Sequence, residues 1–265
     1  MLINLKCVKL KTGELNSLNF NNTPIDKNIE IVDLSLKIDD YLIISDLHLG
    51  YEESLNKEGL MIPKFQFEKI IKRITQIKQS AHYKKIIING DLKHEFGKIT
   101  RQEWKEVNSF LKFLQDNFEE IVLIKGNHDN FIPYITRKLD IEVKETFCIG
   151  NFLILHGHQL PKNLEDFNQD TLIIGHEHPC ISLRSGERVE KIKCFLKGEF
   201  EGKKLIVMPS FNFISDGSDI LHEKLLSPFL KKYSIDYFEV YGIENFEVFP
   251  FGKIKDIIKI SRQFL

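Results

Sequence analysis

Carboxylate, amide and imidazole side chains that can bind metal ions follow five short apolar runs of the sequence. The runs are residues 42–44, 86–88, 121–124, 152–155 and 172–174. Each has the length and composition of a buried strand. The polar residues after them are Asp46, His48, Asp91, Asn127, His128, His156, His176 and His178. Because loops at the carboxyl ends of neighbouring strands meet at one crevice of an α/β sheet, the spacing predicts one metal centre.

Two of these residues, Asp46 and His48, are two positions apart at a strand end, so their side chains can bind one ion. A carboxylate with an imidazole suits Mn²⁺, Fe²⁺, Zn²⁺, Ni²⁺ or Co²⁺ rather than Ca²⁺. We expect Mn²⁺ first among these divalent ions. Asp91 has two carboxylate oxygens and can bridge two ions about 3.5–4 Å apart. Two cations that share a water lower its pKa towards about 7, which gives a hydroxide nucleophile at neutral pH.

The motifs and their order along the chain resemble the signature of the calcineurin-like metallophosphoesterases. They are Asp46-Leu47-His48, Gly90-Asp91, Gly126-Asn127-His128-Asp129, His156-Gly157-His158 and Gly175-His176-Glu177-His178. One such motif would carry little information, but five in order, each after a predicted strand, are specific. The resemblance implies an α/β fold, a four-layer αββα sandwich of two mixed sheets flanked by helices, with the metal site at one edge.

The resemblance also implies a role for each site residue. One ion would be held by Asp46, His48, Asp91 and His178, and the other by Asp91, Asn127, His156 and His176. The neutral amide of Asn127 would leave its ion a stronger Lewis acid, which favours binding of an anionic phosphate. His128 matches the family's catalytic histidine and is expected to protonate the leaving alkoxide. Asp129 is expected to orient His128 and to favour its charged form.

Two stretches resemble the SbcD-like double-strand-break repair nucleases more than generic phosphatases. They are Asp46–Glu52 and Gly90–Phe96. In those nucleases a histidine three residues after the bridging aspartate is linked to nuclease chemistry, which makes His94 a catalytic candidate. The alternative is a polar loop residue that contacts solvent or Glu95.

With Gln102-Glu103-Trp104, the overall match is to the shorter archaeal SbcD-related phosphoesterases, which are similar to phosphoesterases associated with bacterial DNA ligase and helicase genes. The chain is shorter than the SbcD-like nucleases, so their DNA-capping and ATPase-docking activities are not expected. Protein partners in DNA repair would follow from the resemblance alone. The oligomeric state is left open.

The motifs therefore predict a metal-dependent phosphoester hydrolase, first of all a phosphodiesterase with DNA or RNA as candidate substrates. One alternative is a phosphomonoesterase or a cyclic-nucleotide phosphodiesterase, which a deep, narrow pocket would favour. Another is a non-catalytic metal-binding scaffold, against which the retention of every expected ligand counts. Lysine clusters at 69–73, 84–85 and 191–204 could contact nucleic-acid phosphates or form a solvated face.

The composition is that of an ordinary globular protein: 265 residues, 42% hydrophobic, 28% charged and a net charge of −1. This length suits a single domain over 1–265, with strands in 1–40, a motif-bearing core in 41–180, and second-sheet hairpins and C-terminal elements in 181–265. The first residues lack a secretory signal and no apolar run reaches about 18 residues, so a cytoplasmic location without a membrane span is expected. The four cysteines are widely spaced and expected to be free thiols.

Three helices are expected around these strands. Pro63 begins one with Phe67, Ile70, Ile71, Ile74 and Ile77 on its apolar face. Thr100 and Glu103 form the capping box of a second, which is expected to bury Trp104, Val107, Phe110, Leu111 and Leu114. A third is expected near 219–233, before closing strands around 237–248.

Overall fold

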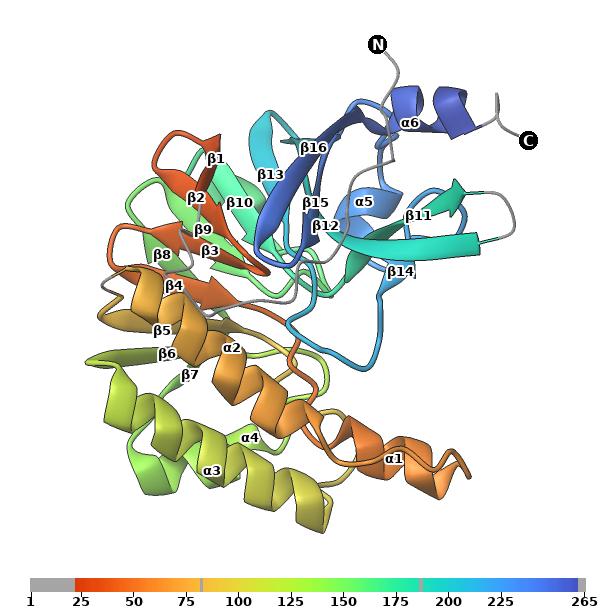
Figure 1. The fold of residues 1–265 in the computed structure, drawn as a ribbon. Coiled ribbons are helices and arrows are strands. Elements are labelled where there is room, and N and C mark those ends of the chain that lie inside the picture. Colours follow the sequence, from red (N-terminus) through yellow and green to blue (C-terminus); the bar gives the residue numbers. More distant parts are fainter. Residues whose placement is uncertain (1–21, 82, 186–187, 262–265) are drawn as a thin grey trace.

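Two β-sheets form the centre of the fold (Figure 1), in a computed structural model that describes residues 22–81, 83–185 and 188–261. The first half of the strand segment expected at 1–40 and the thiol of Cys7 lie outside these residues. The first sheet contains, in spatial order, β1 (Thr23–Asp26), β2 (Ile29–Val32), β3 (Ser35–Ile38), β4 (Tyr41–Ile44), β5 (Lys85–Asn89), β6 (Glu120–Ile124) and β7 (Val143–Lys144). Its strands are antiparallel from β1 to β4 and parallel from β4 to β7.

The second sheet is also mixed and is built from the later part of the chain. Its strands are β8 (Thr146–Ile149), β9 (Phe152–Leu155), β10 (Thr171–Ile174), β11 (Pro179–Ser185), β12 (Arg188–Phe200), β13 (Lys203–Val207), β14 (Ser218–Asp219), β15 (Glu239–Glu244) and β16 (Glu247–Lys253). The spatial order is β14-β11-β12-β13-β10-β9-β8, and β15 pairs with both β12 and β16. Each of the five apolar runs that precede the motifs is confirmed as a strand, namely β4, β5, β6, β9 and β10.

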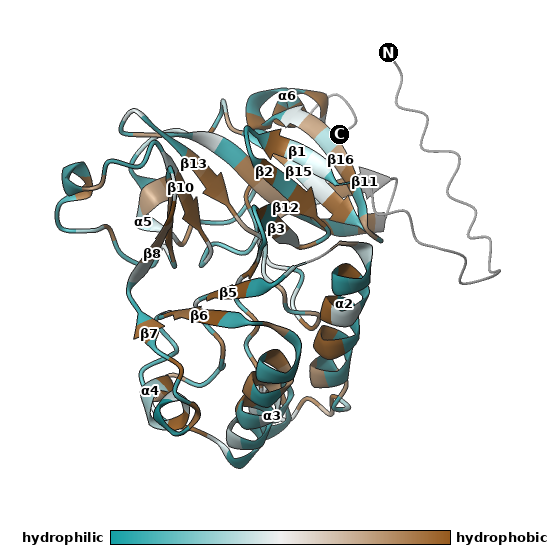
Figure 2. Cartoon of the chain, turned by 90° about the vertical axis from the view of Figure 1, so that its left-hand side faces the viewer, coloured by the Kyte–Doolittle hydropathy of each residue, from teal (hydrophilic) through white to brown (hydrophobic). Residues whose placement is uncertain are grey.

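Helices cover the outer faces of both sheets (Figure 1). The helices are α1 (Tyr51–Lys57), α2 (Gln66–Ser80), α3 (Arg101–Asn117), α4 (Ile132–Thr136), α5 (Pro228–Lys231) and α6 (Ile254–Ser261). Short 3₁₀ turns occur at Arg137–Leu139 and Leu164–Asp166. In Figure 2 both α2 and α3 carry brown and teal residues, as expected for helices with one buried and one solvent-facing side. Among the described residues, no helix is both long and apolar enough to cross a membrane.

The alternation of side chains along the second sheet explains the four layers. Ile173 on β10 and Ile206 on β13 pack in the core that the first sheet shares with α2 and α3. Their neighbours Leu172 and Leu205 point the other way, into a core closed by Phe229 of α5 and by α6. Because both faces of these strands are buried, their sequences are continuously apolar rather than alternating. The expected αββα sandwich is confirmed.

Two expectations about the helices were wrong in their detail. Trp104 is 40% exposed, because the buried face of α3 contains Glu103 and Val107, and Trp104 points away from it. The helix expected near 219–233 is reduced to the single turn of α5. The reason is that the N–H groups of Leu226 and Ser227 donate to the Glu177 carboxylate at 2.7–3.0 Å instead of to helix carbonyls.

The helix α2 starts at Gln66, three residues after Pro63. The carboxylate of Glu52 accepts hydrogen bonds from the N–H groups of Phe65 and Gln66, so a distant acid defines this helix start. The predicted apolar face is confirmed, with Ile70 and the residues one and two turns later fully buried. The capping box of Thr100 and Glu103 is also confirmed.

The packing between the sheets predicts the cost of a cavity there. Ile173→Ala removes a fully buried side chain from the layer between the sheets, so we expect the free energy of unfolding to fall by about 2–5 kcal/mol. The matched control Val189→Ala changes a side chain that is 52% exposed and is expected to cost about 0.5 kcal/mol or less. Urea unfolding of chelator-treated protein measures both. Equal losses would contradict the placement of Ile173 between the sheets.

Candidate metal centre

Loops from both sheets meet at one edge of the sandwich. Backbone hydrogen bonds join the loop after β4 to the loop after β5, from Asp46 N to Gly90 O at 3.1 Å and from His48 N to Asp91 O at 2.9 Å. The loops of the second sheet are joined in the same way, from Gly175 N to His156 O at 2.9 Å. Across the sheets, His176 N donates to the Asp46 carboxylate at 3.0 Å. Motifs that are far apart in the sequence therefore share one backbone framework.

Several expected ligands have a left-handed backbone conformation, which non-glycine residues rarely adopt. The φ angles are +56° at Asp46, +50° at His48, +49° at Asp91, +64° at His176 and +50° at His178. Such conformations cost about 1–3 kcal/mol each and persist where the surrounding structure enforces them, typically at functional sites. Five of the twelve described non-glycine residues with positive φ are thus residues that the sequence assigns to metal binding.

Glycines allow the ligands to approach the backbone closely. A Cβ atom at Gly90 would lie 2.1 Å from Nδ1 of His156, and one at Gly126 would lie 2.0 Å from Oδ1 of Asp91. Real Cβ contacts are never so short, so neither position accepts a side chain without displacing a ligand. These two glycines therefore have a steric role at the site.

The side chains expected to bind each ion lie together. Asp46, His48 and His178 each offer a ligand atom within 4.8 Å of the others, and Asp91, His156 and His176 form a second such group. Asn127 belongs with the second group because its Oδ1 lies 3.1 Å from His156 Nε2. Asp91 lies between the groups: its Oδ2 is 3.8 Å from His48 Nε2 and 3.3 Å from His156 Nε2. The geometry thus reproduces the two expected ligand sets and a shared Asp91.

The donor atoms fit cations. His156 Nδ1 faces the Asn89 carbonyl oxygen at 3.1 Å and must carry the proton that it donates there. Its Nε2 faces Asn127 Oδ1, which is an acceptor, at 3.1 Å, so a proton or a cation must lie between these two atoms. His48 Nε2 and His178 Nε2 also face each other, at 3.4 Å. Facing acceptors repel unless a proton or a cation lies between them, and carboxylate, amide and imidazole donors suit borderline divalent metals.

Opposite charges dominate the electrostatics of these groups. Burial opposes ionisation of Asp46, but His178 and His156 outweigh it and lower the pKa of Asp46 to about 2. The pKa of Asp91 is lowered for the same reason, with His156 as the main partner. Burial disfavours the charged form of His156, yet Asp91 and Asp46 raise its pKa to about 9. Two buried carboxylates thus require positive charge beside them.

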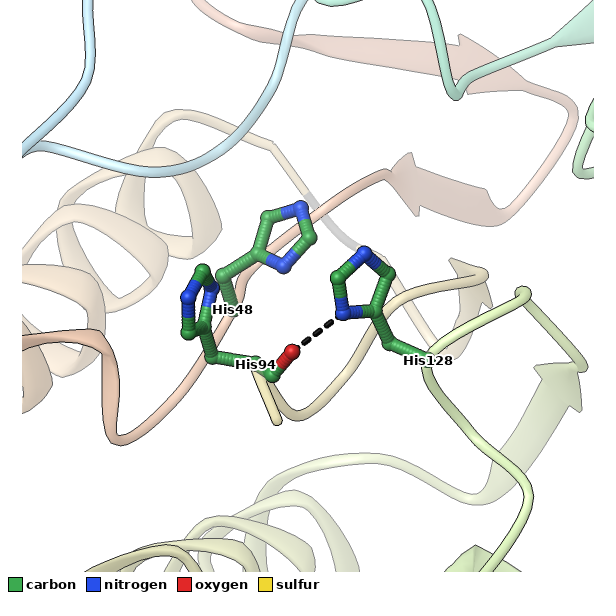
Figure 3. Close-up of side chains that lie close together, drawn as sticks. All are labelled: His48, His94 and His128. Atoms are coloured by element: carbon green, nitrogen blue, oxygen red, sulfur yellow. Dashed lines mark hydrogen bonds between the residues drawn. The ribbon is translucent and has the colours of Figure 1, made fainter. Parts of the chain in front are cut away.

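The expected catalytic histidines lie beside the first group (Figure 3). Ligand atoms of His48, His94 and His128 lie within 4.8 Å of one another. A short hydrogen bond joins His128 Nδ1 to the His94 carbonyl oxygen. Nδ1 is therefore the donor, and Nε2 is the atom that can exchange a proton with a substrate. Nε2 lies 3.7 Å from Asp91 Oδ2, on the side of the metal ligands.

Aromatic rings pack against both histidines. The Phe96 ring centroid is 3.5 Å from that of His128, and the Tyr51 ring stacks on His94 at 4.0 Å. Burial and the neighbouring His128 lower the pKa of His94 to about 4, and burial also lowers the pKa of His128. The His94 ring is thus held by Tyr51 beside His48 and His128, and contact with Glu95 or solvent does not define its position.

The position of Asp129 corrects its expected role. Its carboxylate accepts hydrogen bonds from Leu92 N at 3.0 Å and from Gly126 N at 2.9 Å, so it joins the loops after β5 and β6. Burial and the charge of Asp91 raise its pKa to about 7. Since the partner of the His128 ring is the His94 carbonyl, Asp129 shapes the loop that carries His128 and does not orient the imidazole directly.

Other residues that support the site were missed in the sequence. Gln66 Nε2 donates to the carbonyls of Leu47 and His48 at 3.0 Å, and Ser45 Oγ donates to the Asn89 carbonyl at 2.8 Å. The Glu103 carboxylate accepts from His94 N at 3.1 Å, so the capping box also orders the loop after β5. Only Glu103 had a sequence signal, because isolated buried polar residues follow no spacing rule.

The lysine cluster at 191–204 is engaged within the protein. Lys193 Nζ donates to Ser210 at 2.9–3.0 Å, and burial lowers its pKa to about 7. Lys191 pairs with Glu223 at 3.1 Å. Neither of the two expected roles, phosphate contact or solvated face, holds for Lys193, because it is buried and its Nζ already donates to protein oxygens.

Comparisons with known proteins agree with this architecture. The model of the family described as calcineurin-like phosphoesterase matches residues 40–242. The solved structure of Pseudomonas putida nuclease MPE is 20% identical, with a TM-score of 0.62 over 87% of this chain and 100% of that one. The Escherichia coli phosphoesterase Yfce is 15% identical, with a TM-score of 0.37 over 77% of this chain and 88% of that one. No protein of curated function matches the sequence.

The shared position of Asp91 predicts two divalent ions per chain. Asp91→Asn should lower the affinity for both ions, because it removes the negative charge from the ligand common to both groups. Elemental analysis after loading with Mn²⁺ measures the stoichiometry. Asp116→Asn, which changes an exposed aspartate, is the matched control and should leave it unchanged. A single ion in saturated wild-type protein would contradict the bridging role.

The raised pKa of His156 predicts proton release on metal binding. In chelated protein His156 carries a proton at neutral pH because its pKa is about 9, and a cation at Nε2 must displace it. The stability from this charged histidine is full below its ordinary pKa of 6.5 and is lost as pH rises through about 9. The number of protons released on metal binding should therefore decline as the pH rises through about 9. Calorimetry of metal binding in buffers of different ionisation enthalpy measures this number. Metal binding at neutral pH without proton release would show that His156 is not charged.

Proposed function

The chain belongs to the calcineurin-like phosphoesterase family, and from this premise we propose that it hydrolyses phosphodiester bonds, with nucleic acid as the substrate class. That it is a metal-dependent phosphoesterase follows from the family. The preference for diesters, the choice of Mn²⁺ and the roles of single residues are our proposals. The finer likeness to archaeal SbcD-related proteins, the cytoplasmic location and the DNA-repair partners stay predictions.

One observation carries the proposal. His128, whose Nδ1–H is fixed by a hydrogen bond, lies beside two ligand groups that share Asp91. His128 Nδ1 is held by the His94 carbonyl, and Nε2 lies 3.7 Å from the Asp91 carboxylate. An acid in this position can reach the leaving oxygen of an ester bound at the ligand groups.

The residues of the chain would share the work of the reaction. When bound, two divalent ions would supply Lewis acidity and a hydroxide at neutral pH. Asp46, Asp91 and the ligand histidines would hold those ions, with Asn127 adding a neutral oxygen. His128 would donate the proton that the leaving alkoxide needs. His94, stacked on Tyr51, would position the phosphate-bearing chain beside His128.

Support for a nucleic-acid substrate comes from two sources. The solved structure that aligns over its whole length is that of a nuclease, and it shares the fold of this chain. His94, expected from the sequence to act on nucleic acid, lies with His48 and His128 and has an unpartnered, buried Nδ1. A buried polar atom without a partner among the described residues calls for a functional explanation.

The function predicts how His128 affects different esters. His128→Asn should retain the metals and lower kcat about 10²–10⁴-fold for esters with alkyl leaving groups, because these need a proton. The loss should shrink for nitrophenyl esters, whose leaving group departs as an anion. His222→Asn, which changes an exposed histidine paired with Asp219, is the matched control. The substrates are a model phosphodiester, a model phosphomonoester, cyclic nucleotides, and short DNA and RNA, each with Mn²⁺.

The same panel can reject the proposal. Faster turnover of monoesters or cyclic nucleotides than of open-chain diesters would replace it with the corresponding small-molecule activity. Metal-loaded protein without turnover of any ester would favour the non-catalytic scaffold. Equal losses for alkyl and nitrophenyl esters in His128→Asn would move His128 from proton donation to phosphate binding.

A further inference from the structure

An aromatic pocket opens beside the loops that carry the catalytic histidines. It encloses about 510 Å³, and its lining residues are Ile99, Thr100, Arg101, Trp104, Phe131 and Tyr134. We call these residues the aromatic pocket. Its walls come from two segments: residues 99–104 follow the His94 loop, and residues 131–134 follow His128 by three positions. Both segments thus follow loops of the site closely in sequence, although the pocket contains none of the expected metal ligands.

Two rings of this pocket are exposed to solvent and are not packed in the protein core. Trp104 is 40% exposed and Tyr134 is 63% exposed. Neither ring belongs to the two apolar cores of the described residues, in which α3 is represented by Val107 and the buried residues after it. Single exposed apolar residues are common, but rings gathered around one cavity mark a binding surface.

Positive charge surrounds the same rings. Lys138 Nζ lies 5.3 Å from the Trp104 ring centroid, and four further basic residues nearby are exposed, namely Lys98, Arg101, Lys105 and Arg137. The acidic residues near them are the half-buried Glu53, Glu95 and Glu106 and the exposed Asp140. In the described parts of the chain, none of the five cations forms an ion pair, and Glu53 is paired with Lys57. Unpaired cations therefore lie near these rings.

Phe96 lies in the sequence between His94 and the first residue of the aromatic pocket. Its ring packs 3.5 Å from the His128 ring, yet it remains 54% exposed. Phe96 is three residues before Ile99, the first residue that lines the pocket. An exposed ring that contacts His128 is therefore on the same short segment as one wall of the pocket.

We propose that the aromatic pocket binds a base of a single-stranded nucleic acid whose scissile phosphate lies at the metal centre. The inference rests on the proposed function. Flat rings offer a stacking surface to any unpaired base, and neighbouring cations neutralise the backbone phosphates. Bases within a duplex have no free face, so the arrangement favours single strands. Lys138, whose Nζ lies 5.3 Å from the Trp104 ring centroid, would move from the ring to a backbone phosphate when a base stacks there.

Trp104 itself provides the test, because it is the only tryptophan of the chain. Its fluorescence should be quenched by a single-stranded DNA oligonucleotide added to chelated protein, in which no cleavage can occur. An abasic oligonucleotide of equal length, which keeps the phosphates and lacks the bases, should bind more weakly and leave the fluorescence nearly unchanged. Quenching that is equal for both oligonucleotides, or absent while the oligonucleotide is still cleaved in Mn²⁺, would overturn the subsite. The second result would leave the proposed function intact.

Kinetics provide a second, independent measurement. Tyr134→Ser and Trp104→Ala should lower the ratio of kcat/KM for the oligonucleotide to kcat/KM for a small nitrophenyl diester by about 5- to 150-fold, the range expected for loss of one stacked base. Tyr237→Ser, which changes a ring 66% exposed beside Lys253 and Lys255, should leave the ratio unchanged. An unchanged ratio in the pocket variants would refute the inference. Loss of activity on every ester in wild-type protein, with base-dependent quenching retained, would refute the proposed function instead.

Discussion

The burial of two carboxylates in one small volume is the constraint on which this structure depends. Asp46 is fully buried and Asp91 is 1% exposed, so each needs a compensating positive charge at short range. Imidazoles supply it only in part, because burial opposes their charged forms, as the pKa of about 4 at His176 shows. Divalent cations would supply the remainder. The left-handed backbone at several of these ligands is consistent with a site that holds ligand groups close together in spite of the conformational cost.

The ligand loops are held in place by a ring of buried polar groups. Glu52, Glu103, Asp129 and Glu177 each accept backbone N–H groups from segments distant in the sequence. These bonds satisfy N–H groups that irregular loops would otherwise bury without partners. The loops that carry the ligands are therefore held in place by hydrogen bonds to these buried carboxylates.

Much of the fold could be predicted from the sequence because its signals are local. The five strands before the motifs, the apolar face of α2 and the capping box at Thr100 all follow from residues within a few positions of one another. The grouping of the expected ligands followed from the rule that strand ends converge. These signals required no knowledge of distant partners.

The features that escaped prediction depend on residues far apart in the chain. The start of α2 depends on Glu52, and the collapse of the helix expected at 219–233 depends on Glu177. The partner of the His128 ring is a backbone carbonyl, which no side-chain pattern encodes. Trp104 was placed in the core because its type is apolar, whereas its position on α3 directs it outward.

The division of ligands between the sheets has a mechanical consequence. Asp46, His48, Asp91 and Asn127 follow strands of the first sheet, whereas the three remaining ligands follow β9 and β10 of the second. Apolar contacts between the sheets are non-directional and tolerate small sliding of one layer over the other. Coordinate bonds do not tolerate it. Each ion would therefore act as a cross-link that fixes the alignment of the two halves of the sandwich.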